Sequence, residues 1–415
     1  MRIVIAGAGI GGLTLALSLH QIGITPILCE SVREIAPLGV GINVLPHAVR
    51  ELCELGLEER LGATAIPTAA LAYYSLHGQL IWQEPRGRAA GYAWPQFSVH
   101  RGQLQMLLLT AVRERLGAGA VRTGHAYLDH DQTVHGIEAR FLRPDGSTET
   151  IAADLLIGAD GIHSALRARF HPQEGPPLWN GAILWRGITE APPFLGGRTM
   201  IMAGHETQKF VAYPISRQAR YAGRAVINWV AELKFPPDHA WRREDWNREA
   251  NRADFLPAFA GWHFDWLDIP ALIAGAEHIY EFPMVDRDPL PRWTHGRATL
   301  LGDAAHPMYP IGSNGASQAI LDARVLTREL RRHGPTPEAL AAYEAERNPA
   351  TARIVHANRG QGPEQVMQLV HQRAPEGFTA IADVLSQTEL EEAAGAYKRL
   401  AGFDRETLNT RPPIV

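Results

Sequence analysis

The stretch that most constrains the fold is 2–30, which reads RIVIAGAGIGGLTLALSLHQIGITPILCE. Ile3–Ala6 is a short apolar run, long enough for one buried strand. Three glycines in the spacing G-x-G-x-x-G come next. Leu13–Gln21 then carries apolar residues at helical spacing, and a second apolar run, Pro26–Cys29, is followed by an acid, Glu30. This order of strand, glycine turn, helix, strand and acid predicts a nucleotide-binding unit.

Each glycine of this turn has its own physical reason. A tight turn requires Gly7, close approach of the backbone to a pyrophosphate requires Gly9, and close packing of helix on strand requires Gly12. The helix start offers unpaired N–H groups and the positive end of a dipole to phosphates. Glu30, 18 residues after Gly12, is placed to accept hydrogen bonds from a ribose. The glycines do not separate FAD from NAD(P), and a glycine turn without a ligand is the alternative.

Length and composition narrow the class of protein. A chain of 415 residues exceeds the usual size of a single core, so two domains are expected. The net charge of −4 argues against a general surface for nucleic acid or anionic membrane. Two cysteines cannot build a disulfide framework or a zinc cluster, so no metal site is expected. No apolar run could span a bilayer and no signal peptide precedes the first strand, which favours a cytoplasmic protein.

The segment after Glu30 has fewer local signals. Ser31–Pro46 reads as a glycine-containing loop, either a plain connector or backbone that lines a flat cofactor ring. Ala48–Leu61 reads as a helix, and Ala69–Trp82 as a half-exposed antiparallel strand. Arg101 stands just before the predicted helix Leu104–Leu116. It is either a surface residue or a residue held near the cofactor.

A second motif, ADLLIGADGIHSALRAR, occupies 153–169. Leu155–Ile157 predicts another buried strand, followed by glycines and Asp160, and Ser164 is a candidate N-cap of the next helix. Asp160 either makes only a local turn or contributes a second nucleotide contact.

The region 181–266 differs from the rest of the chain. Short strand-like runs alternate with turns and with many aromatic residues, which predicts a mainly antiparallel second domain. Aromatic residues in such a sheet usually pack in its core. Tyr213 and Trp229 are candidates to line a pocket for a flat substrate.

A third motif, RATLLGDAAHPMYPIGSNGASQAILDA, occupies 297–323. Ala298–Leu301 predicts a buried strand that ends at Asp303. A glycine-framed turn then opens a helix at Ala316, and this exposed helix start can stabilise partial negative charge on a ligand. A structural role is favoured for His306 over a role as catalytic base.

Taken together, the three motifs resemble the class A flavin-dependent aromatic hydroxylases, the p-hydroxybenzoate hydroxylase group. GAGIGG, GADG and GDAAHPMYPIGSNG carry the resemblance, which covers the whole chain. It implies an α/β fold: a Rossmann-like FAD-binding domain with an inserted, mainly antiparallel substrate domain and C-terminal helices. The expected division is 1–70, 98–175 and 276–345 for FAD, 71–97 and 176–275 for substrate, and 346–415 for the C-terminal helices.

The resemblance also implies roles for individual residues. Glu30 would hold the adenosine ribose, the backbone of Tyr127 would meet the adenine, and Asp303 would bind the ribityl and pyrophosphate region. Pro310 would lie beside the reactive edge of the flavin. Candidate cofactor contacts are Gly7, Gly9, Ile10, Gly11, Gly12, Glu30, Ser31, Arg101, Tyr127, Asp160, Asp303, Gly315, Ala316 and Ser317. Candidate substrate contacts are Tyr213, Trp229 and Tyr309.

The implied activity is hydroxylation of an aromatic or heteroaromatic small molecule with O2 and NADH or NADPH, through a flavin C4a-hydroperoxide. The segments LGVGINVLP and MVDRDPLP resemble those of the phenazine-carboxylate hydroxylases. Loss of CO2 from a carboxylated ring carbon is compatible with this chemistry. A flavin epoxidase or Baeyer–Villiger-type oxygenase on the same scaffold, and a flavoprotein module without catalysis, are the alternatives. A monomer or homodimer is expected.

Overall fold

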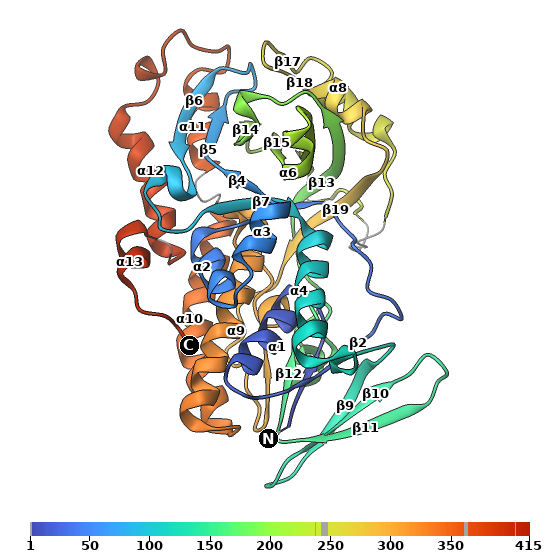
Figure 1. Cartoon of the computed structure of the whole chain (residues 1–415). Helices are drawn as coiled ribbons and strands as arrows, with labels where there is room; N and C mark the ends of the chain where they lie inside the picture. Colours follow the sequence, from blue (N-terminus) through green and yellow to red (C-terminus); the bar gives the residue numbers. More distant parts are fainter. Residues whose placement is uncertain (1, 237, 242–247, 361–363, 403) are drawn as a thin grey trace.

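The computed structural model describes residues 2–236, 238–241, 248–360, 364–402 and 404–415. Figure 1 shows a lower part in which helices surround a parallel sheet, and an upper part built on a large, mainly antiparallel sheet. The expected combination of a Rossmann-like sheet, an antiparallel sheet and C-terminal helices is therefore confirmed.

The parallel sheet brings the three sequence motifs together. Its strands are β1 (Ile3–Ala6), β2 (Ile27–Glu30), β8 (Val121–Thr123), β12 (Leu155–Gly158) and β20 (Ala298–Leu300), in the order β20-β12-β1-β2-β8. β1 pairs with β12 and β2, so Ile5 lies opposite both Ile157 and Leu28. Because all neighbours are parallel, the strands end at the same edge. The glycine turn, Asp160 and Asp303 follow three of these strand ends.

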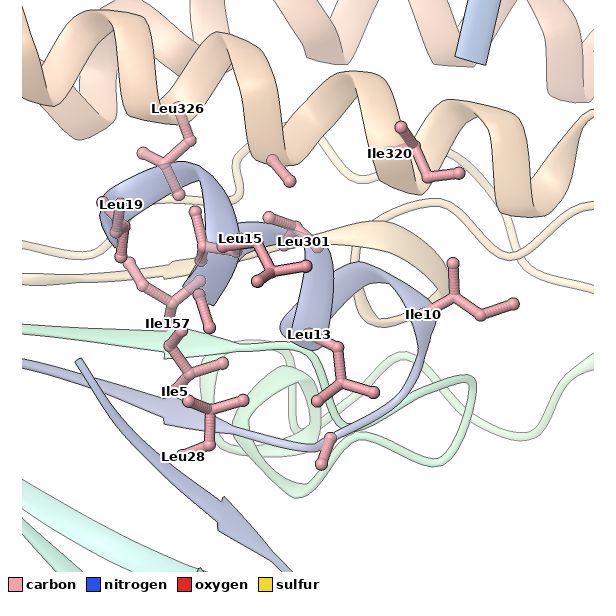
Figure 2. Packing of buried hydrophobic residues seen from close by; sticks show 14 of the residues in the cluster. Ile5, Ile10, Leu13, Leu15, Leu19, Leu28, Ile157, Leu301, Ile320 and Leu326 are labelled. Atoms are coloured by element: carbon pink, nitrogen blue, oxygen red, sulfur yellow. The ribbon is translucent and has the colours of Figure 1, made fainter. Parts of the chain in front are cut away.

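Helix α1 (Ile10–Gln21) lies between these strands and helix α9 (Gly315–His333), as Figure 2 shows. Leu15 and Leu19 of α1 and Leu326 of α9 belong to one buried cluster. α1 begins at Ile10, earlier than predicted, because Gly9 is already its N-cap. The other helices of this part are α2 (Pro46–Glu54), α3 (Glu58–Thr64), α4 (Arg101–Leu116), α5 (Ala165–Phe170) and α10 (Pro337–Arg359).

The large sheet has seven strands, antiparallel except where β14 meets β5. They are β5 (Ala70–Tyr74), β6 (Leu80–Pro85), β13 (Leu178–Ala191), β14 (Thr199–His205), β15 (Gln208–Pro214), β16 (Ala225–Lys234) and β19 (Ile279–Asp286), in the order β19-β13-β16-β15-β14-β5-β6. One face packs on α7 (Leu256–Phe259) and α8 (Ile269–Ala274). On the other face, Met200 and Met202 pack against α11 (Gln365–Arg373).

Three local predictions require correction. The single half-exposed strand expected over Ala69–Trp82 is two strands, β5 and β6, because a turn closes at Gly78, whose φ is +75°. All residues of β5 are buried, since both of its faces are covered. The loop Ser31–Pro46 contains a strand, β3 (Gly41–Val44), which pairs with β7 (Gln96–His100). The helix expected over Ala48–Leu61 is interrupted near Gly56, which has a φ of +72°.

The remaining elements are small. β4 (Ile66–Thr68) completes the sheet β3-β7-β4, and β9 (Ala126–Gln132), β10 (Ile137–Leu142) and β11 (Thr148–Ala153) form a separate antiparallel sheet. The others are β17 (His263–Phe264), β18 (Leu267–Asp268), α6 (Arg217–Tyr221), α12 (Gln387–Leu400) and α13 (Arg405–Thr410). Among the described residues, none of the helices is both long and apolar enough to cross a bilayer.

The domain division stays a prediction, but two elements bear on its boundaries. β19, from the segment 276–345, belongs to the large sheet, and α11, from the segment 346–415, packs on that sheet. Positions 361–363 and 403 of the expected C-terminal helical segment lie outside the described residues.

Candidate active site

The glycine turn shows three different environments for its three glycines. A Cβ on Gly7, whose φ is +106°, would lie 2.3 Å from the carbonyl oxygen of Ala159. A Cβ on Gly12 would lie 2.1 Å from the carbonyl oxygen of Gly7. A Cβ on Gly9 would meet no protein atom within 4 Å. The protein therefore leaves open space beside Gly9, where a cofactor phosphate can approach the backbone.

The start of α1 faces this open space. Gly9 caps the helix without a side chain, so its first amides have no intrahelical acceptor. Gly11 serves packing, since a Cβ there would lie 2.7 Å from Cδ2 of Leu301. Ile10, next to it, is buried. The amides of this first turn form a ready anion site.

Glu30 lies beside the turn, at the end of β2. Its Oε2 accepts a hydrogen bond of 2.8 Å from the backbone N–H of Ala8. Its Oε1 accepts from the hydroxyl of Ser31 at 2.9 Å and from the N–H of Val32 at 3.1 Å. The acid and Ser31 are thus held next to the open space.

Asp160 follows β12 at the same edge. Its Oδ2 accepts hydrogen bonds from the N–H groups of Ala165 at 2.9 Å and Leu166 at 3.5 Å. Ser164 is the N-cap of α5, as expected, and accepts from the N–H of Arg167. Oδ1 of Asp160 is buried without a hydrogen-bond partner among the described residues, and burial raises the pKa of this carboxyl. Asp160 thus makes a local turn and also presents an unsatisfied oxygen.

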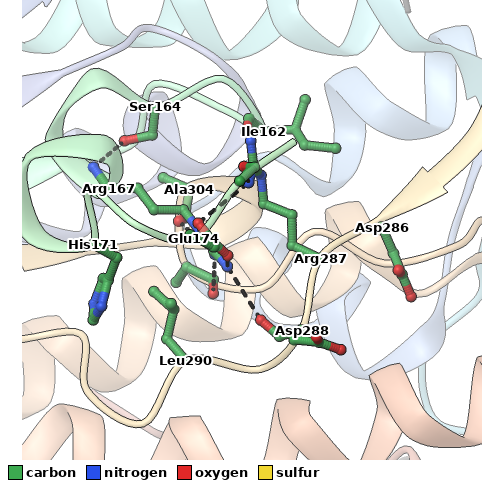
Figure 3. A network of polar contacts seen from close by, with 12 residues as sticks. Ile162, Ser164, Arg167, His171, Glu174, Asp286, Arg287, Asp288, Leu290 and Ala304 are labelled. Atoms are coloured by element: carbon green, nitrogen blue, oxygen red, sulfur yellow. Dashed lines mark hydrogen bonds and ion pairs between the residues drawn. The ribbon is translucent and has the colours of Figure 1, made fainter. Parts of the chain in front are cut away.

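Figure 3 shows a polar network that joins this segment to the third motif. Arg167 donates to the carbonyl oxygens of Ala304 at 3.1 Å and Ala305 at 2.8 Å. It also pairs with Glu174, and Arg287 donates to the carbonyl of Ile162 at 3.2 Å. These contacts hold the second and third motifs in one position relative to each other.

The two other cofactor candidates, Arg101 and Tyr127, come from α4 and β9. The side chain of Arg101 begins α4 and lies against Gly39, where a Cβ would be 3.7 Å from its Cδ. Tyr127 lies in β9, and its hydroxyl is 2.6 Å from Nδ1 of His130. Its ring also meets Phe141 edge-on. The side chain of Tyr127 is thus engaged within the sheet of β9, β10 and β11.

A cavity of about 210 Å³ lies between the large sheet and the third motif. Its apolar wall comes mostly from the sheet: Leu184, Met200, Met202, Val211, Val230 and Met284. Asp303, Pro310, Gly315 and Ala316 line the side formed by the third motif. Such a hollow, mostly apolar with a few polar groups, is typical of a small-molecule site.

The third motif presents the start of α9 to this cavity. The helix begins at Gly315 after a cap residue, Asn314, that makes no side-chain capping bond. Ser317 is buried behind it and its hydroxyl accepts from the N–H of Leu45 at 3.2 Å. Asp303 is exposed to the cavity, and the protein that surrounds it raises the pKa of its carboxyl. A helix start with free amides favours negative charge on a ligand.

His306 has a structural place. Its Nε2 is 2.5 Å from Oδ2 of Asp322, which also accepts from the N–H of Gly302 at 3.1 Å. Arg347 donates to the other oxygen of Asp322 at 2.7 Å. Burial would raise the pKa of Asp322, but His306 and Arg347 outweigh it and lower the pKa to about 2. This ion network fixes the turn at Asp303 to α9.

The three candidate substrate contacts have different positions. Tyr213 lines the cavity, and its hydroxyl donates to the carbonyl of Gly41 at 2.9 Å. Trp229 does not line it: the side chain is fully buried on the other face of the sheet, where Nε1 donates to Oγ1 of Thr189 at 3.0 Å. Successive side chains of a strand point to opposite faces, so Val230 faces the cavity and Trp229 cannot. Tyr309 is buried next to this wall.

Sequence reasoning missed the charged residues of the cavity other than Asp303. Arg186, Lys209, Glu232 and Glu364 line it, from β13, β15, β16 and the residue before α11. Charged residues inside otherwise apolar strands, such as the lysine of QKFVAYP, were the available signal.

Comparisons with known proteins agree with this geometry. A family model described as "FAD binding domain" matches residues 1–258 and 266–358. The chain is 50% identical over 388 residues to phenazine 1,6-dicarboxylic acid hydroxylase PhzS of Lysobacter antibioticus, covering 92% of this chain and 95% of that protein. It is 33% identical over 380 residues to 3-amino-4-hydroxybenzoate 2-monooxygenase PtmB3 of Streptomyces platensis, covering 88% of each.

Solved structures show the same fold. Klebsiella pneumoniae HpxO complexed with FAD and uric acid superposes with a TM-score of 0.74 at 26% identity, over 98% of this chain and 96% of that one. A salicylate hydroxylase substrate complex gives a TM-score of 0.73 at 24% identity, over 100% of this chain and 99% of that one. The chain belongs to the FAD-binding family of class A flavin-dependent aromatic hydroxylases and is an FAD-dependent monooxygenase.

Proposed function

We propose that this enzyme hydroxylates a phenazine-like heteroaromatic compound in the cavity between the large sheet and α9, with O2 and with NADH or NADPH as electron donor. The observation that carries the proposal is the cavity itself, which has an apolar wall from the sheet and the start of α9 on another side. The identity of 50% to a phenazine 1,6-dicarboxylic acid hydroxylase supports this substrate class. Hydroxylation can proceed with loss of CO2 where the attacked ring carbon bears a carboxylate.

The residues present fit FAD along the edge of the parallel sheet. The open space at Gly9 and the first amides of α1 suit the pyrophosphate, and the unsatisfied oxygen of Asp160 suits a further polar contact at this edge. Glu30 and Ser31 would hold the adenosine ribose, with the backbone of Tyr127 at the adenine and Asp303 at the ribityl chain. Arg101 would lie near the flavin.

The start of α9 would hold the flavin ring at the cavity. The amides of Gly315, Ala316 and Ser317 would face its N1–O2 edge, where reduced flavin carries negative charge. Pro310 would form the wall beside the reactive edge. When bound, FAD supplies the redox chemistry that transfers one oxygen atom from O2 to the ring.

The protein itself would position the aromatic substrate and keep water away from it. The apolar side chains of the sheet would orient the aromatic ring and exclude water. Exclusion of water protects a reactive intermediate from side reactions. The backbone of β3 contributes Gly41, Ile42 and Asn43 to the same wall. A monomer or homodimer in the cytoplasm stays our expectation from the sequence.

The test is oxidation of NADH and NADPH by the FAD-loaded enzyme in ¹⁸O2, across phenazines, quinolones, salicylates and hydroxybenzoates, with product mass measured in parallel. The expected result is one labelled oxygen in a hydroxylated phenazine, with or without loss of CO2. An epoxide product would indicate a flavin epoxidase instead of a hydroxylase. A ring-expanded lactone would indicate a Baeyer–Villiger-type oxygenase. A protein that binds FAD but gives only hydrogen peroxide with every aromatic compound would contradict the proposal.

A further inference from the structure

Apart from Asp303, the charged residues of the cavity fall into two sets with opposite character. Arg186 donates to the carbonyl of Gly41 at 2.8 Å and has no ion pair among the described residues. Its Nε is buried without a hydrogen-bond partner in that part of the chain. The second set contains one lysine, Lys209, and two acids, Glu232 and Glu364.

The second set, which we call the acidic cluster (Lys209, Glu232 and Glu364), is closely paired. Nζ of Lys209 lies 3.0 Å from Oε2 of Glu232 and also contacts Oε2 of Glu364. The three side chains are 7–9% exposed. Burial and the neighbouring carboxylate of Glu364 raise the pKa of Glu232, while the ammonium of Lys209 opposes this shift. With both acids ionised, one ammonium and two carboxylates give the cluster a net charge of −1.

One acid of the cluster has a second carboxylate oxygen besides the one that pairs with Lys209. Oε2 of Glu232 is the oxygen that pairs with Lys209. Glu232 lines the cavity. A carboxylate oxygen in this position can accept a hydrogen bond from a bound molecule.

The two sets lie apart along the same face of the sheet. Arg186 is directly opposite Val230 in the pairing of β13 with β16, and Glu232 is two residues further along. Two residues of a strand span about 7 Å. The cavity thus has a cationic side at Arg186, an anionic side at Glu232 and apolar side chains between them.

We propose that Glu232 is a specificity-determining residue that accepts a hydrogen bond from a hydroxyl or ring N–H of the aromatic substrate and, with the acidic cluster, excludes a carboxylate from that side of the cavity. The inference rests on the proposed function only in placing the substrate in this cavity. A site that hydrogen-bonds a donor rejects an analogue that cannot donate, because its buried polar group then stays unpaired. A carboxylate there also meets a cluster of its own sign.

The experiment compares ligands that differ only in this group. Equilibrium dissociation constants of the oxidised FAD-loaded enzyme are measured without reductant for two pairs: 3-hydroxybenzoate against benzene-1,3-dicarboxylate, and 6-hydroxyphenazine-1-carboxylate against phenazine-1,6-dicarboxylate. Because no turnover occurs, the readout is independent of activity. We expect the hydroxylated member of each pair to bind at least tenfold more tightly.

The variant Glu232→Gln removes one charge from the acidic cluster and is expected to reduce this preference by about tenfold. Glu190→Gln is the matched control: it removes one charge from the same sheet, at an exposed ion pair with Arg224, and should leave the preference unchanged. Circular dichroism and flavin absorbance show whether Glu232→Gln folds. If it does not, Glu364→Gln removes one negative charge from the acidic cluster instead. A preference of unchanged size in the charge variant, or none in the parent enzyme, would overturn the proposal.

The same ligands separate this inference from the proposed function. Selective binding without ¹⁸O incorporation into any aromatic compound would contradict the proposed function alone. Labelled product together with equal binding of both members of each pair would contradict the role of Glu232 alone.

Discussion

The hydroxyl of Tyr213 donates a hydrogen bond of 2.9 Å to the carbonyl of Gly41. This bond joins the large sheet to the sheet β3-β7-β4 at the wall of the cavity. Arg186 donates to the same carbonyl at 2.8 Å, and the N–H of Gly41 donates to Oδ1 of Asn228 at 2.6 Å. Three side chains of the large sheet therefore hold the first residue of β3 in place.

Tyr213→Phe should loosen this junction without leaving the carbonyl of Gly41 unpaired, because Arg186 still donates to it. We expect a loss of about 1 kcal/mol in the free energy of unfolding, as for one buried hydrogen bond, and a raised KM for the aromatic substrate. Urea denaturation and steady-state kinetics measure both. Tyr221→Phe, which changes an exposed tyrosine, is the control and should alter neither. An unchanged KM in Tyr213→Phe would show that β3 does not shape the cavity.

Alanine substitutions at Gly9 and Gly12 should separate cofactor binding from folding. A methyl group at Gly12 meets the carbonyl of Gly7 at 2.1 Å, so we expect a loss of about 1–3 kcal/mol in stability from overpacking. A methyl group at Gly9 meets no protein atom within 4 Å, so the apoprotein should keep its stability while its affinity for FAD falls. Thermal unfolding of the apoprotein and titration with FAD check this. Parental FAD affinity in Gly9→Ala would contradict the assignment of the open space to the pyrophosphate.

The two faces of β16 and β15 should respond differently to substitution. Trp229 packs over Gly187, where a Cβ would lie 2.4 Å from its ring, so Trp229→Phe should cost about 1–3 kcal/mol of stability and leave the KM for substrate unchanged. Val211 lines the cavity, and Val211→Ala should raise the KM with a smaller loss of stability. The opposite pattern would contradict the assignment of the two faces.

Acid should destabilise the protein through His47. Burial, together with the nearby Arg411 and Arg347, lowers the pKa of this histidine to about 3. The unfolded chain therefore takes up the proton first as the pH falls below about 6.5, so the stability contributed by neutral His47 is complete above that pH and is lost toward lower pH. Between pH 7 and pH 5 the expected loss is about 2 kcal/mol.

The measurement is urea denaturation of the parent and of His47→Gln at both pH values. The parent should lose about 2 kcal/mol more than the variant over this interval. Equal pH dependence in the two proteins would mean that His47 is not held neutral in the fold.

The three motifs could be predicted from the sequence because each is a local signal. Apolar runs, glycines at fixed spacing and the start of a helix stand next to one another in 2–30, 153–169 and 297–323, and the parallel sheet unites them. The strand β3 was missed because tertiary pairing with β7, not local pattern, decides it. The break near Gly56 had a local signal that was overlooked, since a glycine with positive φ commonly ends a helix.

The cavity wall could be predicted only in part. Tyr213 and Trp229 look alike as aromatic residues in strands, and only the register of β15 and β16 shows that they face opposite sides. The acidic cluster joins positions 209, 232 and 364, which no spacing rule connects. Contacts of this kind depend on how the C-terminal helices pack on the sheet.

A crystal structure of the enzyme with FAD and an aromatic ligand tests the arrangement of the site most directly. We expect the pyrophosphate at Gly9–Gly12, the flavin ring at the amides of Gly315–Ser317, and the aromatic ligand in the cavity beside Pro310 and Tyr213. A flavin ring bound away from the start of α9, or an aromatic ligand outside this cavity, would contradict it.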